Sequence, residues 1–304
     1  MIKASRHTLF ANIVQQFCAG LLLLFLPNIL GKADYAQVVF VMVLLSFVAF
    51  ADAGMSMAYG RVVPSLLAQN KHDEVKIWDS TTLRFGLAMS CFCSVIMTII
   101  YYHRYGNLIN TLLLLPMPFV VFWFSFHVSR FSTFGNFSCY SKVNTWRSIG
   151  SLLVFPLAFT FGLTGFFISQ LVAALLALAS IGKILFKPLG KLHWSLLRHH
   201  LLEGVIRSLT GILWINLMNF SRLYASIKYG AEDIATYGIM SSAAQSLLSL
   251  VISLFLPVGV ELFNRHGKSE LHALEFAHHI IRRSIKWTMP VPYTHLTLPT
   301  NREV

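Results

Sequence analysis

Long uncharged apolar runs, separated by short polar segments, dominate the chain up to about residue 260. The runs predict transmembrane spans at Leu9–Leu30, Tyr35–Gly60, Phe85–Tyr102, Gly106–Ser129, Ser208–Ile227 and Ile234–Val260, and two more within Ser148–Gly182. As one helix, Ser148–Gly182 would be about 52 Å long, well beyond the roughly 30 Å of a bilayer core. Because Gly162-Leu-Thr-Gly165 interrupts it, we expect two helices joined by a tight turn. The pattern therefore predicts an all-α polytopic membrane protein with about eight transmembrane helices.

The segment after the eighth predicted span has a different character. Apolar residues and one histidine recur there at steps of three and four, namely Leu271, Leu274, His278, Ile281 and Ile285, with basic residues on the remaining surface. This spacing predicts an amphipathic helix that lies at the membrane interface. Residues 291–304 do not continue the pattern. We expect them to be a non-native tail, and the natural protein to continue beyond residue 290.

The charge of the chain follows the same topology. Charged residues make up 12% and apolar residues 56% of the chain, whereas about a quarter of a soluble domain is charged. Of the 24 Lys and Arg residues, the predicted spans place 19 on the side of the N-terminus, among them Arg84, Arg130 and Arg147, and four on the other side, with Arg302 in the tail. The positive-inside rule then puts the N-terminus in the cytoplasm. Topology thus explains the net charge of +12, and we expect no nucleic-acid partner.

Motifs for catalysis or for cofactor binding are not found in the sequence. There is no phosphate-binding loop followed by Lys-Ser/Thr, no His-Glu-x-x-His and no paired carboxylates. Cys91 and Cys93 lack a partner pair and the spacing of a zinc site. We therefore expect no enzyme, no cofactor and no metal, which leaves transport as the chemistry of such a helical bundle.

Polar side chains inside the predicted spans are the candidates for that function, because they are costly to hold in a membrane. Helical spacing places several of them on common faces of spans one, seven and eight. The predicted substrate-binding residues are Arg222, Asn216, Asn219, Gln15, Gln16 and Gln245. An arginine such as Arg222 can bind a phosphate group through two hydrogen bonds. An open alternative is that the amides and hydroxyls hold the helices together.

Asp52 is the other charge within a predicted span. By helical rise, it lies roughly 9 to 18 Å from Arg222 along the membrane normal, too far for direct contact. We expect Asp52 near the cytoplasmic mouth, as a gating charge with Arg61 as its candidate partner.

Two stretches of the sequence resemble a known family. The first is Ala51-Asp-Ala-Gly-Met55, followed by Arg61; the second is Asn219-Phe-Ser-Arg222, leading into Tyr229-Gly-Ala-Glu-Asp-Ile-Ala-Thr-Tyr237. Both are similar to the polysaccharide and O-antigen flippases of the multidrug/oligosaccharidyl-lipid/polysaccharide exporter superfamily, over residues 1 to about 290. The resemblance implies two six-helix lobes, with spans one, two, seven and eight lining a central cavity. The chain would then divide into a first lobe (1–190), a partial second lobe (191–290) and the tail (291–304).

The same resemblance implies a function. The cargo would be an undecaprenyl-diphosphate-linked oligosaccharide, moved across the bacterial cytoplasmic membrane by a rocking, alternating-access cycle. Its partners would be membrane lipids and a polysaccharide polymerase or glycosyltransferases. The family often has an acidic residue before the span-seven arginine, whereas this chain has Ser221, so the resemblance does not carry over ion coupling at that point.

Two alternatives stay open. One is a multidrug or cation antiporter of the same superfamily, which would favour acidic residues within the membrane, where this chain offers Asp52. The other is a non-transporting membrane subunit of a polysaccharide-synthesis complex.

In the two-lobe fold that the resemblance implies, the eight predicted spans would make one lobe and the first two helices of a second.

Overall fold

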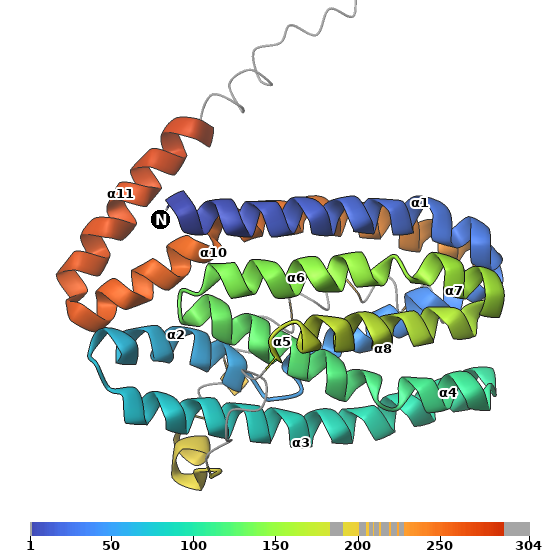
Figure 1. The fold of residues 1–304 in the computed structure, drawn as a ribbon, viewed down its shortest axis with the longest axis horizontal. Helices are drawn as coiled ribbons and strands as arrows, with labels where there is room; N and C mark the ends of the chain where they lie inside the picture. The colour runs from blue at the N-terminus through green and yellow to red at the C-terminus, as the bar shows by residue number, and fades with distance from the viewer. Residues whose placement is uncertain are drawn as a thin grey trace, which may run out of the picture.

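The computed structural model describes residues 2–182, 191–200, 205–206, 209, 213, 219, 224 and 228–288. In this described part every regular element is a helix, and the long helices lie alongside one another in one bundle (Figure 1). Three helical segments, Arg6–Ser46, His72–Tyr105 and Leu108–Thr133, are long and apolar enough to cross a membrane. The chain is an all-α polytopic membrane protein, as the sequence predicts.

Helix α1 (Ile2–Ser46) consists of two arms rather than one straight rod. Gly31 lies between them with φ 76° and ψ 164°, a conformation that residues with a side chain rarely adopt, and the chain reverses direction there (Figure 1). The second arm ends in the 3-10 turn η1 (Phe47–Phe50), and α2 (Met55–Ala68) starts only after a further turn. The prediction of one continuous span over Tyr35–Gly60 is therefore wrong in its second half, where Asp52 lies in the break.

Helices α3 (His72–Tyr105), α4 (Leu108–Leu114) and α5 (Met117–Thr133) form the next two crossings. The predicted span Gly106–Ser129 is present as α4 and α5, separated at Pro116, whose ring nitrogen cannot donate to a helical hydrogen bond. Residues 61–84, between the predicted spans Tyr35–Gly60 and Phe85–Tyr102, are mostly helical, because α2 and α3 extend into this segment. Only a short turn separates them, with Asn70 at a φ of 61°.

Helices α6 (Phe137–Ser151), α7 (Val154–Phe161) and α8 (Leu163–Ala179) confirm the two helical segments and the tight turn predicted within Ser148–Gly182. The tight turn falls at Gly162, which has φ 58° and ψ −136°. Just beyond it, Gly165 lies so close to the backbone of α7 that a Cβ atom would overlap the carbonyl oxygen of Leu157. Since α6 begins at Phe137 rather than near Ser148, Arg147 lies within a helix.

Replacing Gly165 by alanine is expected to destabilise the protein by about 1–3 kcal/mol, because the added methyl group must push α7 and α8 apart. The matched control is Gly20→Ala in α1, where a Cβ atom meets nothing within 4 Å. That control should leave stability unchanged or raise it slightly, since alanine favours a helix over glycine. Thermal melting of the purified protein in detergent measures both variants, and equal melting temperatures would contradict the close packing at this turn.

Helix α10 (Ala231–Lys268) confirms the predicted eighth span and extends it at both ends. It is followed by α11 (Glu270–Thr288), the predicted amphipathic helix. Ala273 and Phe276 of α11 are buried, whereas Leu271, Leu274 and Ile281 are exposed, so the predicted apolar face is left uncovered in the described part of the protein. The predicted seventh span lies almost wholly outside the described residues, and the tail from residue 291 lies outside them entirely.

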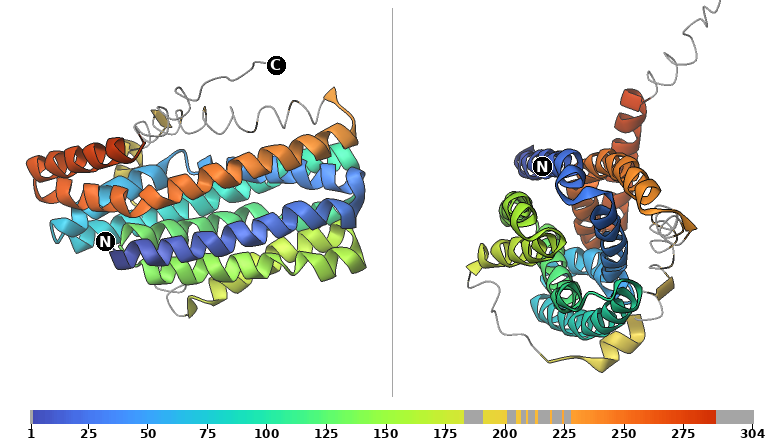
Figure 2. Two further views of the ribbon diagram at one scale, coloured as in Figure 1. Left: turned by 90° about the horizontal axis from the view of Figure 1, so that it is seen from above. Right: turned by 90° about the vertical axis from the view of Figure 1, so that its right-hand side faces the viewer.

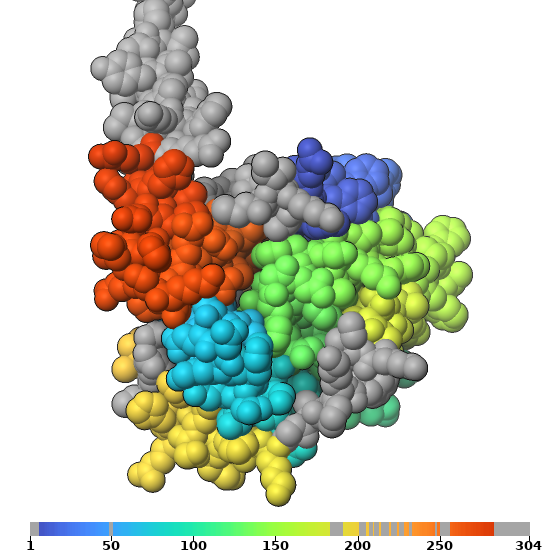
Figure 3. Space-filling view, turned by 60° about the vertical axis from the view of Figure 1, so that its left-hand side comes forward, coloured from blue at the N-terminus to red at the C-terminus, as the bar shows by residue number. Residues whose placement is uncertain are grey.

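The bundle has two ends. The N-terminus lies at one of them, here called the N-terminal end, where α2 turns into α3 and α10 turns into α11; the turn at Gly162 lies at the opposite end (Figures 1 and 2). Figure 3 looks towards the N-terminal end and shows α11 (red) above the α2–α3 segment (cyan). There, the Ser65 hydroxyl of α2 donates a 2.9 Å hydrogen bond to the carbonyl oxygen of Phe263 in α10. Helix α10 therefore reaches the first half of the chain directly.

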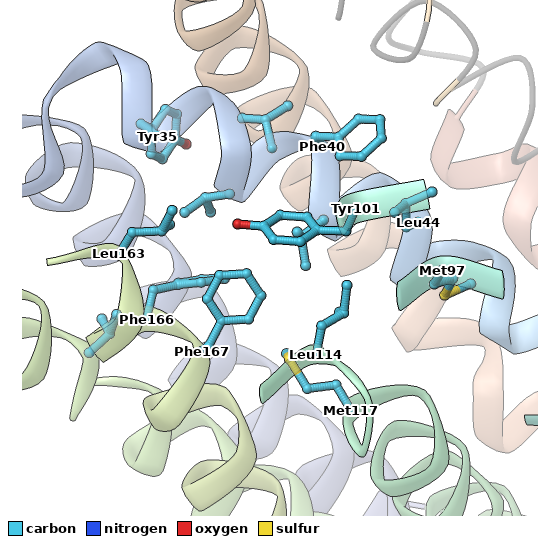
Figure 4. Packing of buried hydrophobic residues seen from close by; sticks show 14 of the residues in the cluster. Tyr35, Phe40, Leu44, Met97, Tyr101, Leu114, Met117, Leu163, Phe166 and Phe167 are labelled. Carbon is cyan, nitrogen blue, oxygen red and sulfur yellow. The ribbon is translucent and has the colours of Figure 1, made fainter. Parts of the chain in front are cut away.

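The largest cluster of buried apolar residues joins α1, α3, α4, α5, α7, α8 and α10. Its centre is aromatic: Tyr101 of α3 faces Phe167 of α8 at 5.6 Å between ring centroids (Figure 4). Ile234 and Ala235 at the start of α10 are buried in the same cluster. This core fixes how α1 and α10 lie against each other, which determines the site described next.

Candidate functional site: a polar seam between α1 and α10

A row of polar side chains lies where α10 meets both arms of α1. Gln16 of the first arm donates a 2.5 Å hydrogen bond from Nε2 to the hydroxyl oxygen of Ser249 in α10. One turn earlier on α10, Gln245 donates from Nε2 to Oδ1 of Asn219, at 3.4 Å. Because Gln245 and Ser249 are four residues apart on one helix, they share a face.

The second arm of α1 joins the same row through Ser46. Asn219 is buried and donates from Nδ2 to the Ser46 hydroxyl oxygen at 3.1 Å, while that hydroxyl donates to the carbonyl oxygen of Val43 at 2.6 Å. We call Gln16, Ser46, Asn219, Gln245 and Ser249 the polar seam. Residues from three distant parts of the sequence thus meet in one row, as two hydrogen-bonded groups on the same face of α10.

Two buried side-chain amide atoms in or beside the seam could each form a further hydrogen bond. Nδ2 of Asn12 and Oε1 of Gln16 are buried, and neither has a hydrogen-bond partner among the residues that the structure describes. Both side chains lie on one face of the first arm, four residues apart. Since a buried amide atom without a partner costs roughly 1–3 kcal/mol, this face is suited to receive a polar ligand or water.

The other predicted substrate-binding residues are placed differently. Gln15, next to Gln16 in sequence, is exposed and outside the seam, because successive residues of a helix point to different faces. Arg222 and Asn216 lie outside the described residues. The structure therefore brings together Gln16, Asn219 and Gln245 from the predicted set, and adds Ser46 and Ser249.

Asp52 is fully buried in the break between η1 and α2, where it holds the start of α2. Its carboxylate accepts hydrogen bonds from the backbone N–H groups of Gly54, at 3.1 Å, and Ser56, at 2.7 Å, and from the Ser56 hydroxyl. Arg61 is exposed and, within the described residues, forms no ion pair with Asp52. The expected Asp52–Arg61 pair is thus absent from this arrangement, and the carboxylate caps a helix instead.

Replacing Asp52 by alanine is expected to lower stability by about 1–2 kcal/mol, because the two backbone donors and the Ser56 hydroxyl lose their acceptor. Asp52→Asn keeps one acceptor oxygen and should lose less. Detergent melting curves give the stabilities, and transport per folded molecule gives the function of the intact protein. If Asp52→Asn abolished transport while leaving stability unchanged, the carboxylate would serve as a transport charge rather than a cap.

A second charged cluster, which the sequence interpretation missed, joins α2, α3 and α5. Arg130 donates from Nε to Oδ2 of Asp79 at 2.9 Å, and the Tyr59 hydroxyl donates to the other carboxylate oxygen. The Arg130 and Asp79 side chains are 19% and 21% exposed, so the pair is largely removed from solvent. The sequence predicts Arg130 outside the spans, on the side of the N-terminus, where an exposed salt bridge would contribute little.

Arg147 is the other missed charge. It lies ten residues into α6, or about 15 Å along the helix, and its guanidinium carbon sits 4.4 Å from the centre of the Phe124 ring in α5. Its Nη1 atom is buried and has no hydrogen-bond partner. It lines a cavity of about 210 Å³ between the second arm of α1, α5, α6 and α8, together with Ser46, Gln170 and apolar side chains. The prediction that Arg147 lies outside the spans is therefore wrong, because its side chain packs inside the helical bundle.

The fold and the seam define a class: a multi-pass α-helical membrane protein with polar side chains along the contact of its first and last long helices. Neither a protein-family profile nor a curated relative matches this sequence. Among solved structures, the chain is similar to the crystal structure of a mutant of the Vibrio cholerae MATE transporter VcmN. The TM-score is 0.68 at 15% sequence identity, over 91% of this chain and 68% of that one. At this identity the likeness shows the fold: the chain has the helical fold of a MATE transporter.

Proposed function

We propose that this protein is a membrane transporter that moves an undecaprenyl-diphosphate-linked oligosaccharide across the bacterial cytoplasmic membrane. Three observations support it: the fold shared with a MATE transporter, the flippase-like stretches around Asp52 and Asn219, and the polar seam. In this proposal the N-terminal end of the bundle faces the cytoplasm, because basic residues gather there. The seam lies along the path of the sugar.

The observation that carries the proposal is the chemistry of the seam. Its side chains are amides and hydroxyls, which donate to and accept from sugar hydroxyl groups without introducing a charge. The two acids in the described bundle core are already occupied, since Asp52 binds the start of α2 and Asp79 binds Arg130. A neutral polar ligand therefore matches the available groups better than an organic cation does.

The multidrug or cation antiporter is the second candidate, and the MATE fold of the structural neighbour favours it. Such a transporter needs a carboxylate that a cation or a proton can reach. Two candidates among the described residues are Asp52 and Asp79, and each would first have to leave its present partners. This requirement separates the two candidates experimentally.

The test uses two bacterial strains, one lacking its own O-antigen flippase and one lacking its drug-efflux pumps. Each expresses the intact source gene, including any coding sequence that follows residue 290. We expect surface polysaccharide to return in the first strain and sensitivity to cationic dyes to stay unchanged in the second. Dye resistance without polysaccharide would establish the antiporter instead, and neither activity from a well-expressed protein would favour a non-transporting subunit.

A further inference from the structure

The cavity beside Arg147 is lined by one positive charge and, among the described residues, by no negative one. Its lining combines one guanidinium, one amide and one hydroxyl with an otherwise apolar surface. Arg147 lies near the middle of α6 and α7 taken together, far from either end of the bundle. A charge at such a depth is costly unless an opposite charge or several acceptors accompany it.

The described residues supply no such partner to Arg147. No carboxylate forms an ion pair with it there, and its Nη1 atom is buried without any acceptor. The Phe124 ring, 4.4 Å from the guanidinium carbon, stabilises the cation from one face but does not neutralise it. The remaining charge faces the cavity.

We infer that this cavity binds a small monovalent inorganic anion such as chloride, held by Arg147 and Gln170. Arg147 contributes charge and N–H donors, and the Gln170 side-chain amide can contribute a further N–H donor. The Ser46 hydroxyl already donates to Val43, so it lines the site without donating to the anion.

The volume of the cavity limits the size of the anion that can bind in it. About 210 Å³ holds a halide with a few waters, at roughly 30 Å³ per water. It is smaller than the roughly 300–1,000 Å³ of pockets that enclose drug-sized ligands, and a diphosphate with an attached sugar would not fit. The site is thus distinct from the seam, although Ser46 borders both. An anion bound here would neutralise Arg147 whatever cargo the protein carries, so the inference does not depend on the proposed function.

The test is the melting temperature of the purified protein as chloride replaces gluconate, a bulkier organic anion, at constant ionic strength. We expect saturable stabilisation of about 2–4 °C. Arg147→Gln should abolish the shift. The matched control Lys142→Gln, which removes one positive charge from an exposed position of the same helix, should retain it. No shift in the unmodified protein, or the same shift in Arg147→Gln, would overturn the inference.

A second measurement does not depend on a variant that folds. Crystals of the unmodified protein grown in bromide should give an anomalous peak beside the Arg147 guanidinium, and an empty cavity would again refute the site. Undecaprenyl phosphate separates a free anion from a lipid headgroup. If it, but not chloride, gave an Arg147-dependent shift, the cavity would belong to the lipid cargo and the small-anion site would be wrong.

Discussion

Arg130→Met is expected to destabilise the protein by about 3 kcal/mol, the low end of the cost of breaking a buried ion pair. Without Arg130, the Asp79 carboxylate is left largely buried with the Tyr59 hydroxyl as its remaining partner. Adding Asp79→Asn should recover part of the loss, because the unpaired charge disappears. Melting curves of the two single variants and the double variant, taken as a double-mutant cycle, give the coupling energy.

The chain contains a matched control for this pair. Lys76 and Asp73 lie at the start of the same helix, α3, with a similar separation of 2.8 Å, but their side chains are 76% and 93% exposed. Lys76→Met should therefore change stability by less than about 1 kcal/mol. If Arg130→Met melted at the same temperature as Lys76→Met, the Asp79–Arg130 pair would have no special role in holding α3 to α5.

Removing two amides from the polar seam should have the largest effect on transport. In the double variant Gln16→Leu/Gln245→Leu, we expect surface polysaccharide in the flippase-deficient strain to form at least roughly tenfold more slowly. The reason is that two hydrogen bonds to the sugar, at about 1 kcal/mol each, are lost. Leucine keeps the approximate volume and the helix propensity, so the packing of α1 against α10 should persist.

The control for the seam is Asn28→Leu, which removes an exposed amide from the same helix, α1, where it donates to the Leu24 carbonyl oxygen of its own turn. It should transport normally. The measured stability of the variants distinguishes two possible roles of the seam, which are binding the cargo and holding the helices together. If the double variant lost stability in proportion to its lost transport, the amides would hold the helices together, and a role in binding cargo would have no support.

The spans could be predicted because an uncharged run of twenty residues has few other uses, but several of their ends could not. α3 starts at His72 because Val75, Trp78 and Thr82 already form a buried stripe at helical spacing. Charges between them hid this stripe, since Asp79 meets its partner Arg130 from a distant part of the sequence. In the sequence alone, the first turns of α3 are therefore as polar as a loop.

Arg147 shows a related limit. Counting basic residues assigns each one to a connecting segment, and this holds for Lys71, which is exposed and lies in the turn between α2 and α3. It fails for Arg147 because Phe124 and the cavity accommodate the guanidinium inside the bundle. Only the packing of α5 against α6 reveals that environment.

The seam was predictable in composition but not in its pairs. Helical spacing places Gln245 and Ser249 on one face of α10, and the sequence could identify that face. It could not choose between Gln15 and Gln16, since the choice depends on the rotation of α1 about its own axis. In the structure the first arm of α1 is rotated so that Ala11, Cys18 and Leu26 are buried.

The central claim is that the polar seam serves the passage of a lipid-linked sugar. The most direct measurement is the transfer of an undecaprenyl-diphosphate-linked oligosaccharide between the leaflets of proteoliposomes that contain the intact source protein. We expect transfer by the unmodified protein and by Asn28→Leu, and a rate at least roughly tenfold lower for Gln16→Leu/Gln245→Leu. Equal rates for all three proteins, or transport of a cationic dye with no transfer of the lipid-linked sugar, would contradict it.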